Sequence, residues 1–368
     1  MGLAVLATFL VLLGIEVATR ASLSAGETDA LPQVGVGVED LYRAVWLERR
    51  AQRMRQGGDG AAFRWDMHDP LLGWRPRPHI ERRHVLPGSF DVIVRTNETG
   101  LRGTRAFAVE KPPGWNRVAI FGCSQTFGGT IDEGETYADR LAASLVNVEV
   151  LNFGVHGYGT DQMLLRLQRD GLPYAPDIVV LGFAAYHMER NALGFRFYGK
   201  PRFVLEAAEL KLTGVPIPSP DELATRPPPA APAPLADRSV FVRWIWGRLL
   251  EARISALQKS GSPGWPVTKA LVERFAHVAR ERGMTMVLLN LEDVDPDIEA
   301  RLDELAGELD VGFVNLGPEF RRLRRAGRSY RHRGDFHWTP DGHRIIADAL
   351  RAHLCTHALV DCGASGAQ

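Results

Sequence analysis

VAIFGCSQTFGG, residues 118–129, is the stretch from which the organisation of the chain can be worked out. It begins as an apolar run of strand length, and Gly122 ends that run in a glycine-flanked turn that carries Ser124. A strand that ends in Gly-x-Ser places a hydroxyl at the carboxyl edge of a sheet, where open α/β folds build their sites. The stretch therefore predicts both a sheet and a candidate nucleophile at its edge.

Outward from this stretch, apolar runs of strand length alternate with amphipathic helical segments, which is typical of a doubly wound parallel sheet. The predicted strands are residues 118–121, 148–153, 178–183, 286–291 and 312–316. They are almost uniformly apolar, as expected of parallel strands that are buried on both faces. We predict an α/β fold, namely a flavodoxin-like doubly wound parallel sheet of about five strands with helices on both faces.

A second stretch supplies the base and the orienting acid that a serine nucleophile needs. GDFHWTPDGH, residues 334–343, holds Asp335 and His337 two residues apart. A serine attacks a carbonyl only when a base takes its proton, and an acid that orients the base completes a triad. The hypothesis is a triad of Ser124, His337 and Asp335 in a hydrolase or acyltransferase. His343 is interpreted as structural, with a role as the base kept as the alternative.

These motifs resemble sequence blocks of the SGNH (GDSL-like) hydrolase and acyltransferase family. The turn around Ser124 is similar to the first block, with Cys123 where that family usually has Asp. NFGVHGYGT, residues 152–160, is similar to the second block, and its glycine is Gly157. Residues 334–343 are similar to the last block, in the form Asp-x-His rather than Asp-x-x-His.

The third block of that family carries an Asn after the third strand, and here the match is weakest. Tyr186 or His187 stands at the corresponding place, and Asn191 follows shortly after. The resemblance implies an oxyanion hole built from the backbone N–H groups of Ser124 and Gly157, and it makes Asn191 the candidate for a side-chain donor. Losing one such donor typically costs about 2.7–4 kcal/mol.

Composition excludes several classes of partner. The chain has 44 basic and 44 acidic residues, so net charge does not suggest binding to nucleic acid. No histidines are spaced as metal ligands and no phosphate-binding glycine loop is present, so we predict neither a metal nor another cofactor. The three cysteines are too few for a disulfide framework. Cys355 and Cys362 either pair in an oxidising compartment or remain reduced thiols.

The N-terminal residues predict a membrane segment. Residues 2–18 are almost wholly apolar, with Glu16 as the only charge, and their number approaches the roughly 20 residues that cross a bilayer. No basic residue precedes the segment and no small-x-small cleavage site follows it, so we expect an uncleaved anchor, with a signal peptide as the alternative. The catalytic domain would then be periplasmic or extracellular.

The chain divides into four predicted parts. Residues 1–23 are the anchor or signal, and residues 24–116 are a linker, a helix and a β-hairpin region. Residues 117–355 are the SGNH-like α/β domain with an insert at 192–265, and residues 356–368 are a tail. The insert is either a lid over the site or a surface excursion.

Two polar segments have predicted roles as loops. Residues 216–234 are rich in Pro and Ala, which predicts an extended surface loop without a regular helix. Residues 321–333 are rich in arginine and are expected to form a basic loop just before Asp335.

The resemblance implies an enzyme that cleaves or transfers an O-acyl group, and the acyl group expected before any other is acetyl. The expected substrate is an exported or cell-envelope polysaccharide, with a lipid ester as the second class, and the expected membrane contact is the N-terminal helix. Two alternatives stay open: a catalytically silent carbohydrate-binding or assembly protein with the same fold, and a lysophospholipase-like esterase.

Overall fold

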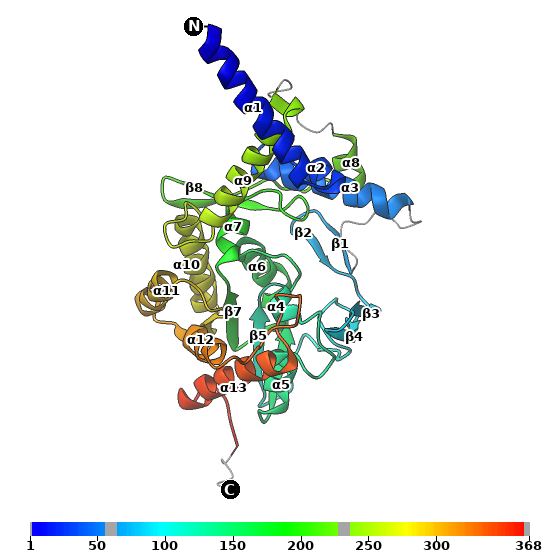
Figure 1. Cartoon of the computed structure of the whole chain (residues 1–368). Coiled ribbons are helices and arrows are strands. Elements are labelled where there is room, and N and C mark those ends of the chain that lie inside the picture. The colour runs from blue at the N-terminus through cyan, green and yellow to red at the C-terminus, as the bar shows by residue number, and fades with distance from the viewer. Residues whose placement is uncertain (1, 56–64, 227–235, 364–368) are drawn as a thin grey trace.

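A five-stranded parallel sheet lies at the centre of the protein (Figure 1). The computed structural model describes residues 2–55, 65–226 and 236–363. The strands, in their order across the sheet, are β6 (Val148–Asn152), β5 (Asn116–Phe121), β7 (Ile178–Phe183), β10 (Thr285–Asn290) and β11 (Gly312–Asn315). Along the chain this is the order 2-1-3-4-5 of flavodoxin-like folds. The prediction of a parallel, doubly wound sheet is confirmed.

Side chains of the strands alternate between two apolar cores. Val118 and Ile120 belong to one core, and Ala119 and Phe121 belong to the other. The first core includes residues of α5 (Tyr137–Ala143), α12 (Gly317–Arg325) and α13 (Pro340–Thr356); the second includes residues of α6 (Thr160–Arg166), α10 (Trp265–Glu281) and α11 (Pro296–Leu309). Burying each large apolar side chain contributes about 1.5–3 kcal/mol, so helices are held on both faces of the sheet.

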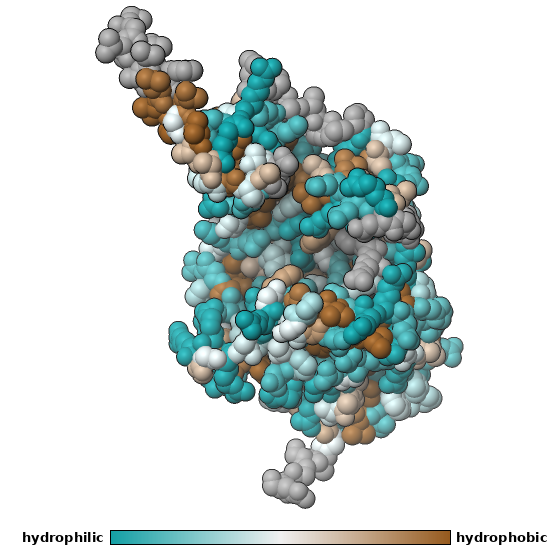
Figure 2. Space-filling view, turned by 45° about the vertical axis from the view of Figure 1, so that its right-hand side comes forward, coloured by the Kyte–Doolittle hydropathy of each residue, from teal (hydrophilic) through white to brown (hydrophobic). Residues whose placement is uncertain are grey.

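Three helices precede the sheet: α1 (Gly2–Ser22), α2 (Ala25–Ala30) and α3 (Val38–Arg55). Figure 2 shows apolar side chains on α1 where it projects from a largely polar surface, and Leu10, Val11, Leu12 and Leu13 are about half exposed there. Across the described residues, no helix combines the length and the apolarity needed to cross a membrane. The anchor predicted over residues 1–23 is therefore not supported.

Glu16 joins α1 to α9 (Val240–Ala256). Its carboxylate accepts hydrogen bonds from the Ser239 hydroxyl at 2.8 Å and from the backbone N–H groups of Val240 at 2.9 Å and Phe241 at 3.0 Å. The first N–H groups of a helix have no partner within the helix, and a carboxylate there also complements the helix dipole. Glu16 thus caps a helix that lies more than 200 residues further along the chain.

Two antiparallel hairpins lie between α3 and the sheet: β1 (Asp66–Asp69) with β2 (Gly73–Pro76), and β3 (Glu81–Leu86) with β4 (Phe90–Arg95). The second lies in the predicted β-hairpin region and turns after Leu86, and Phe90, Val92 and Val94 of β4 pack in one cluster with Phe127. Phe127 is the last residue of α4 (Ser124–Phe127), which directly follows β5. The hairpin therefore supports the turn that carries the candidate nucleophile.

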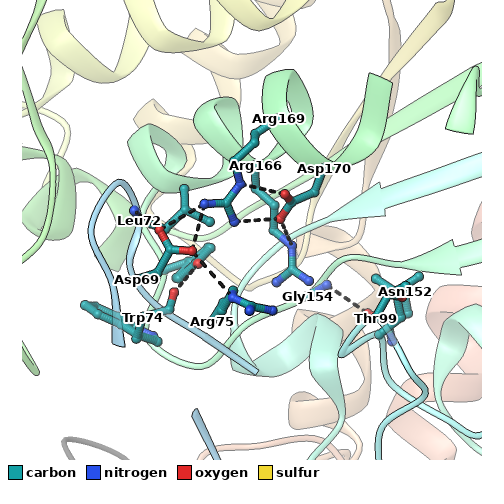
Figure 3. Close-up of polar contacts among 12 residues, drawn as sticks. Asp69, Leu72, Trp74, Arg75, Thr99, Asn152, Gly154, Arg166, Arg169 and Asp170 are labelled. Atoms are coloured by element: carbon teal, nitrogen blue, oxygen red, sulfur yellow. Dashed lines mark hydrogen bonds and ion pairs between the residues drawn. The ribbon is translucent and has the colours of Figure 1, made fainter. Parts of the chain in front are cut away.

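An ion-pair network fastens the first hairpin to the sheet domain (Figure 3). Asp69, at the end of β1, contacts Arg169 at 2.7 Å and Arg75 at 3.6 Å. Arg169 also contacts Asp170 at 2.6 Å, and Asp170 lies 3.7 Å from the buried Arg166 of α6. This network fixes the hairpin against the segment that follows α6, and residues just before and within β1 reach the candidate site.

The insert contains more regular structure than the sequence predicted. After α7 (Tyr186–Ala192), β8 (Arg202–Glu206) pairs with β9 (Glu209–Thr213). The prediction that residues 216–234 lack a helix is wrong at α8 (Pro220–Thr225), because Ser219 caps it with a capping box and Pro is tolerated at the first helical position. Residues 227–235 of that predicted loop lie outside the described residues.

Two further differences concern the C-terminal part. The predicted basic loop at 321–333 begins as helix, because α12 continues to Arg325 and buries Phe320 and Leu323. Cys355 and Cys362 form a disulfide, with Cα atoms 5.8 Å apart. The disulfide ties residue 362 back to the end of α13, so the tail is linked to the domain.

Candidate active site

Ser124 is the first residue of α4, directly after β5 at the carboxyl edge of the sheet. The turn is tight: a Cβ added at Gly122 would collide with the side chain of Thr126, so glycine is required there. Ser124 is 6% exposed, and that exposed surface lines a pocket. β5 and β7 are neighbours at which the strand order reverses, and such switch points are where α/β sheets bind ligands.

Asp335 and His337 meet in the loop before α13. One carboxylate oxygen of Asp335 accepts hydrogen bonds from the ring Nδ1 of His337 at 2.6 Å and from its backbone N–H at 2.7 Å. The hydrogen bond from His337 lowers the pKa of Asp335 to about 2, so the carboxylate is ionised at neutral pH. With Nδ1 protonated and held, Nε2 of the neutral ring is left as the proton acceptor.

Ser124 and His337 line the same pocket, which has a volume of about 380 Å³. The lining residues are Trp65, Asp66, His84, Ser124, His156, Gly157, Arg190, Phe197, Phe336 and His337. Among the described residues no hydrogen bond joins the Ser124 hydroxyl to His337. Hydrogen bonds between catalytic groups are often long without substrate and tighten when it binds.

Gln125 connects the two halves of the predicted triad. It follows Ser124, is 1% exposed, and its side-chain amide donates to the carbonyl oxygen of Phe336 at 3.2 Å. Because Phe336 directly precedes His337, this hydrogen bond sets the distance between the serine turn and the histidine loop. No sequence motif marks Gln125, because its partner lies 211 residues away in the sequence.

Two backbone N–H groups are available as oxyanion donors. Within the described part of the chain, neither the Ser124 N–H nor the Gly157 N–H has a hydrogen-bond acceptor. Asn152 holds the two loops together, because its amide donates to the Thr126 carbonyl at 2.8 Å and accepts from Gly154 N–H at 2.9 Å. The structure thus brings together the predicted residues Ser124, Gly157, Asp335 and His337.

Replacing Gly157 by alanine is expected to lower kcat/KM for an ester by about 10²- to 10³-fold, the typical cost of one lost oxyanion donor. Gly157 has φ +75°, and an added Cβ would lie 2.5 Å from the ring of Phe197, so the N–H would be displaced. Ester kinetics and thermal unfolding measure the effect. Gly88→Ala is the matched control, because Gly88 also has φ +75° but no atom within 4 Å of the added Cβ.

Asn191 is not brought to the pocket. It is fully buried on α7, where its amide donates to the hydroxyl of Thr268 at 2.9 Å and accepts from the N–H of Asp161 at 3.3 Å. Asn191 does not line the pocket that holds Ser124, and the expectation that it supplies a third oxyanion donor is not met. The cause is that α7 turns this face towards α10 instead of the sheet edge.

The other residues of the weak third block have structural contacts. The hydroxyl of Tyr186 lies 3.1 Å from the sulfur of Cys123, which is fully buried beside the serine. His187 is also fully buried, and its Nδ1 accepts from the backbone N–H of Ala184 at 3.2 Å. Burial lowers the pKa of His187 well below its ordinary value, so this ring is neutral.

His343 is structural, as interpreted. It is 1% exposed, and its Nδ1 accepts from the backbone N–H of Tyr137 at 3.1 Å. Burial lowers the pKa of His343 to about 3. His156 does line the pocket, but burial likewise lowers its pKa to about 3, and its ring packs against Trp65 and Phe127. Neither ring carries a charge at neutral pH.

Sequence reasoning missed several residues of the pocket wall. Trp65 and Asp66 come from the start of the first hairpin, Phe197 from the insert, and Arg190 from α7. Phe336 is half exposed beside His337. Nothing in the local sequence marks Trp65, Asp66 or Phe197, because each reaches the pocket through tertiary contacts. The only available signal was the position of Arg190 soon after the third strand.

The Asp66→Asn substitution is expected to stabilise the protein increasingly as pH rises from 4 to 8. Burial raises the pKa of Asp66 from 3.8 to about 7, against the opposing charges of Arg166 and Arg77. A raised acid pKa destabilises the folded state progressively between those two values and by a constant amount above about pH 7. The Tm difference between variant and wild type at pH 4, 6 and 8 measures this. Asp91→Asn is the control: its hydrogen bond with Arg83 lowers the pKa of that exposed carboxyl, so its contribution changes only below about pH 3.8, and its Tm difference should stay nearly constant from pH 4 to 8.

No protein-family model matches the sequence, and no curated protein matches it. Several solved structures are similar in fold, at low identity. A lipase/acylhydrolase from Enterococcus faecalis has a TM-score of 0.41 and 12% identity, over 68% of this chain and 100% of that chain. An acetylxylan esterase from Geobacillus stearothermophilus has a TM-score of 0.40 and 12% identity, over 67% of this chain and 96% of that chain. A member of the lipolytic G-D-S-L family from Veillonella parvula has a TM-score of 0.38 and 14% identity, over 63% of this chain and 94% of that chain. Because each TM-score is below 0.5, the case for an active site rests on the geometry of this chain's own residues.

Proposed function

We propose that the protein is a serine ester hydrolase that removes a short acyl group, acetyl first, from a hydroxyl of a carbohydrate. One observation carries this proposal. Ser124, Gly157 and His337 border a single pocket, and Asp335 holds the ring of His337 at 2.6 Å. A nucleophile, a base, an orienting acid and oxyanion donors are the parts that acyl transfer requires.

The proposed reaction has two steps. Nε2 of His337 takes the proton of the Ser124 hydroxyl as the oxygen attacks the ester carbonyl, and the Ser124 and Gly157 N–H groups stabilise the oxyanion. His337 then donates the proton to the departing alcohol, which leaves an acyl group on Ser124. Water, or a sugar hydroxyl in an acyltransferase, then gives a proton to His337 as its oxygen attacks the acyl carbonyl carbon. His337 returns that proton to the Ser124 oxygen as the bond between the acyl group and Ser124 breaks, and Asp335 stabilises the imidazolium each time it forms.

The shape of the pocket supports a short acyl group and a sugar. A volume of about 380 Å³ is at the small end of the range for ligand pockets. Trp65, Phe197 and Phe336 give it flat apolar walls, against which the C–H face of a sugar ring can pack. The disulfide between Cys355 and Cys362 supports a periplasmic or extracellular location, because disulfides persist in oxidising compartments.

A fluorophosphonate probe tests the proposal on the full chain. The probe should add to the peptide that contains Ser124, and the Ser124→Ala variant should remain unlabelled. 4-Nitrophenyl acetate should be cleaved faster than 4-nitrophenyl palmitate. A folded protein in which Ser124 stays unlabelled would favour the silent carbohydrate-binding protein, and preference for the palmitate would favour the lysophospholipase-like esterase.

A further inference from the structure

Arg190 lines the pocket that holds Ser124, although it is only 5% exposed. It lies on α7, which begins shortly after β7 at the switch point of the sheet. A guanidinium remains charged at any ordinary pH, so this pocket carries a fixed positive charge in its wall.

The position of the guanidinium is well determined. One terminal nitrogen of Arg190 donates to the carbonyl oxygen of Tyr158 at 2.9 Å. The group also stacks over the ring of Tyr186 at 4.2 Å and lies 5.7 Å from the centre of the ring of Phe197. These contacts use one N–H of the fork, so its other donors remain for a ligand.

No carboxylate lies within 4 Å of the Arg190 guanidinium in the described part of the chain. Other arginines differ in this respect: the buried Arg117 and the partly exposed Arg196 are paired with carboxylates, whereas the buried Arg102 donates to the carbonyl oxygens of Arg95 and Ile131. Arg117 donates to Glu149 at 2.9 Å, and Arg196, which packs 4.6 Å from the centre of the same Phe197 ring, contacts Glu189 at 2.7 Å. Arg190 is therefore an arginine without a carboxylate partner that lines the pocket holding Ser124.

Two acidic residues, Glu292 and Asp66, do not neutralise the positive charge of Arg190. Glu292 interacts electrostatically with Arg190 but contacts Arg331, at 3.5 Å. Burial raises the pKa of Glu292 to about 7. Asp66 lines the pocket, but burial raises its pKa to about 7 as well. His156 in the pocket wall is neutral. At slightly acid pH the pocket is thus left with an uncompensated cation.

We propose that Arg190 determines specificity by binding a carboxylate on the substrate, so that the ester cleaved is that of an acidic sugar. A buried charge without a partner is costly, and an anionic ligand repays that cost on binding. A single guanidinium fork matches the single charge and the two oxygens of a carboxylate. This inference rests on the proposed carbohydrate esterase function.

The first experiment measures selectivity with the full chain. The substrates are an O-acetylated methyl glucuronide and the O-acetylated methyl glucoside, which differ in the carboxylate. Wild type should favour the glucuronide in kcat/KM by about 10- to 100-fold, the range for one charge-assisted hydrogen-bonded contact. Arg190→Met should bring the ratio close to one, and Arg190→Lys should keep part of it.

Arg196→Met is the matched control, because Arg196 packs on the same Phe197 ring but is paired with Glu189. It should leave the ratio unchanged. Equal losses on both substrates in Arg190→Met would overturn the inference and assign Arg190 to holding the Gly157–Tyr158 loop or to the oxyanion. A wild-type ratio near one would overturn it without any variant.

A second readout separates this inference from the proposed reaction. In the Ser124→Ala variant, methyl glucuronide should raise Tm more than methyl glucoside at equal concentration. On that background Arg190→Met should remove the difference, and Arg190→Lys should keep part of it. If the wild-type chain cleaves no ester but the Tm difference is present, the reaction is wrong and carboxylate binding stands. Equal Tm shifts in an active enzyme would contradict the role of Arg190 alone.

Discussion

Replacing Ser124 by alanine should lower kcat/KM for 4-nitrophenyl acetate by roughly 10⁴-fold or more, because no acyl-enzyme can form. The same change should leave stability within about 0.5 kcal/mol of wild type, as for substitutions that break no buried contact. The Ser124 hydroxyl has no hydrogen-bond partner among the described residues, so its removal leaves no unsatisfied group. Ester kinetics and thermal unfolding of the same preparation separate the two effects.

Ser144→Ala is the control for this variant. Ser144 caps the end of α5 and its hydroxyl donates to the Leu141 carbonyl at 2.9 Å, away from the pocket. Its kinetics should equal those of wild type. Retention of most of the esterase activity in Ser124→Ala would remove the proposed nucleophile and, with it, the two-step reaction.

The Asp335→Asn substitution should lower kcat/KM by about 10³- to 10⁴-fold with little change in fold. An amide at this position offers an N–H to His337 as readily as an oxygen, so the ring loses the carboxylate that selects its tautomer and stabilises its cation. Rates measured between pH 5 and 9 should fall at every pH, because the pKa of Asp335 is lowered to about 2 and the wild-type carboxylate is ionised throughout.

The sign of the accompanying stability change follows from that lowered pKa. Asp335 stabilises the folded protein above the ordinary carboxyl pKa of 3.8, and that contribution is lost as pH falls towards 2. Asp341→Asn is the matched control, since Asp341 is an exposed carboxylate on the first turn of the next helix. If both substitutions reduce activity equally, the effect is one of local charge, and the triad assignment fails.

The sheet could be predicted because its strands are continuous apolar runs that need no partner to be identified. The pairing of Asp335 with His337 could be predicted because both residues lie in one loop, where two residues of separation limit their distance. The glycine at 157 was found by the resemblance, and its φ of +75° gives the physical reason for that residue type.

The rest of the pocket depends on contacts that a linear pattern does not contain. Asp66 reaches the pocket only because the hairpin that it begins is fastened to a segment about 100 residues away. Arg190 lies in a polar heptapeptide of α7 that looks like an ordinary exposed helix, yet that helix is buried between α6 and α10. The position of Asn191 was misjudged for the same reason, because the direction of a side chain on a short helix is decided by its neighbours.

The carboxylate of Glu16 has a practical consequence for anyone who shortens this chain. A fragment that starts at residue 24 would lack the acceptor of three hydrogen bonds at the start of α9. Such a fragment exposes the beginning of the insert's longest helix, and proteolysis is expected to begin between residues 236 and 243. Ser239 already caps α9 by accepting from the Val242 N–H at 3.1 Å, so retaining the N-terminal helix is the safer design for producing the protein in quantity.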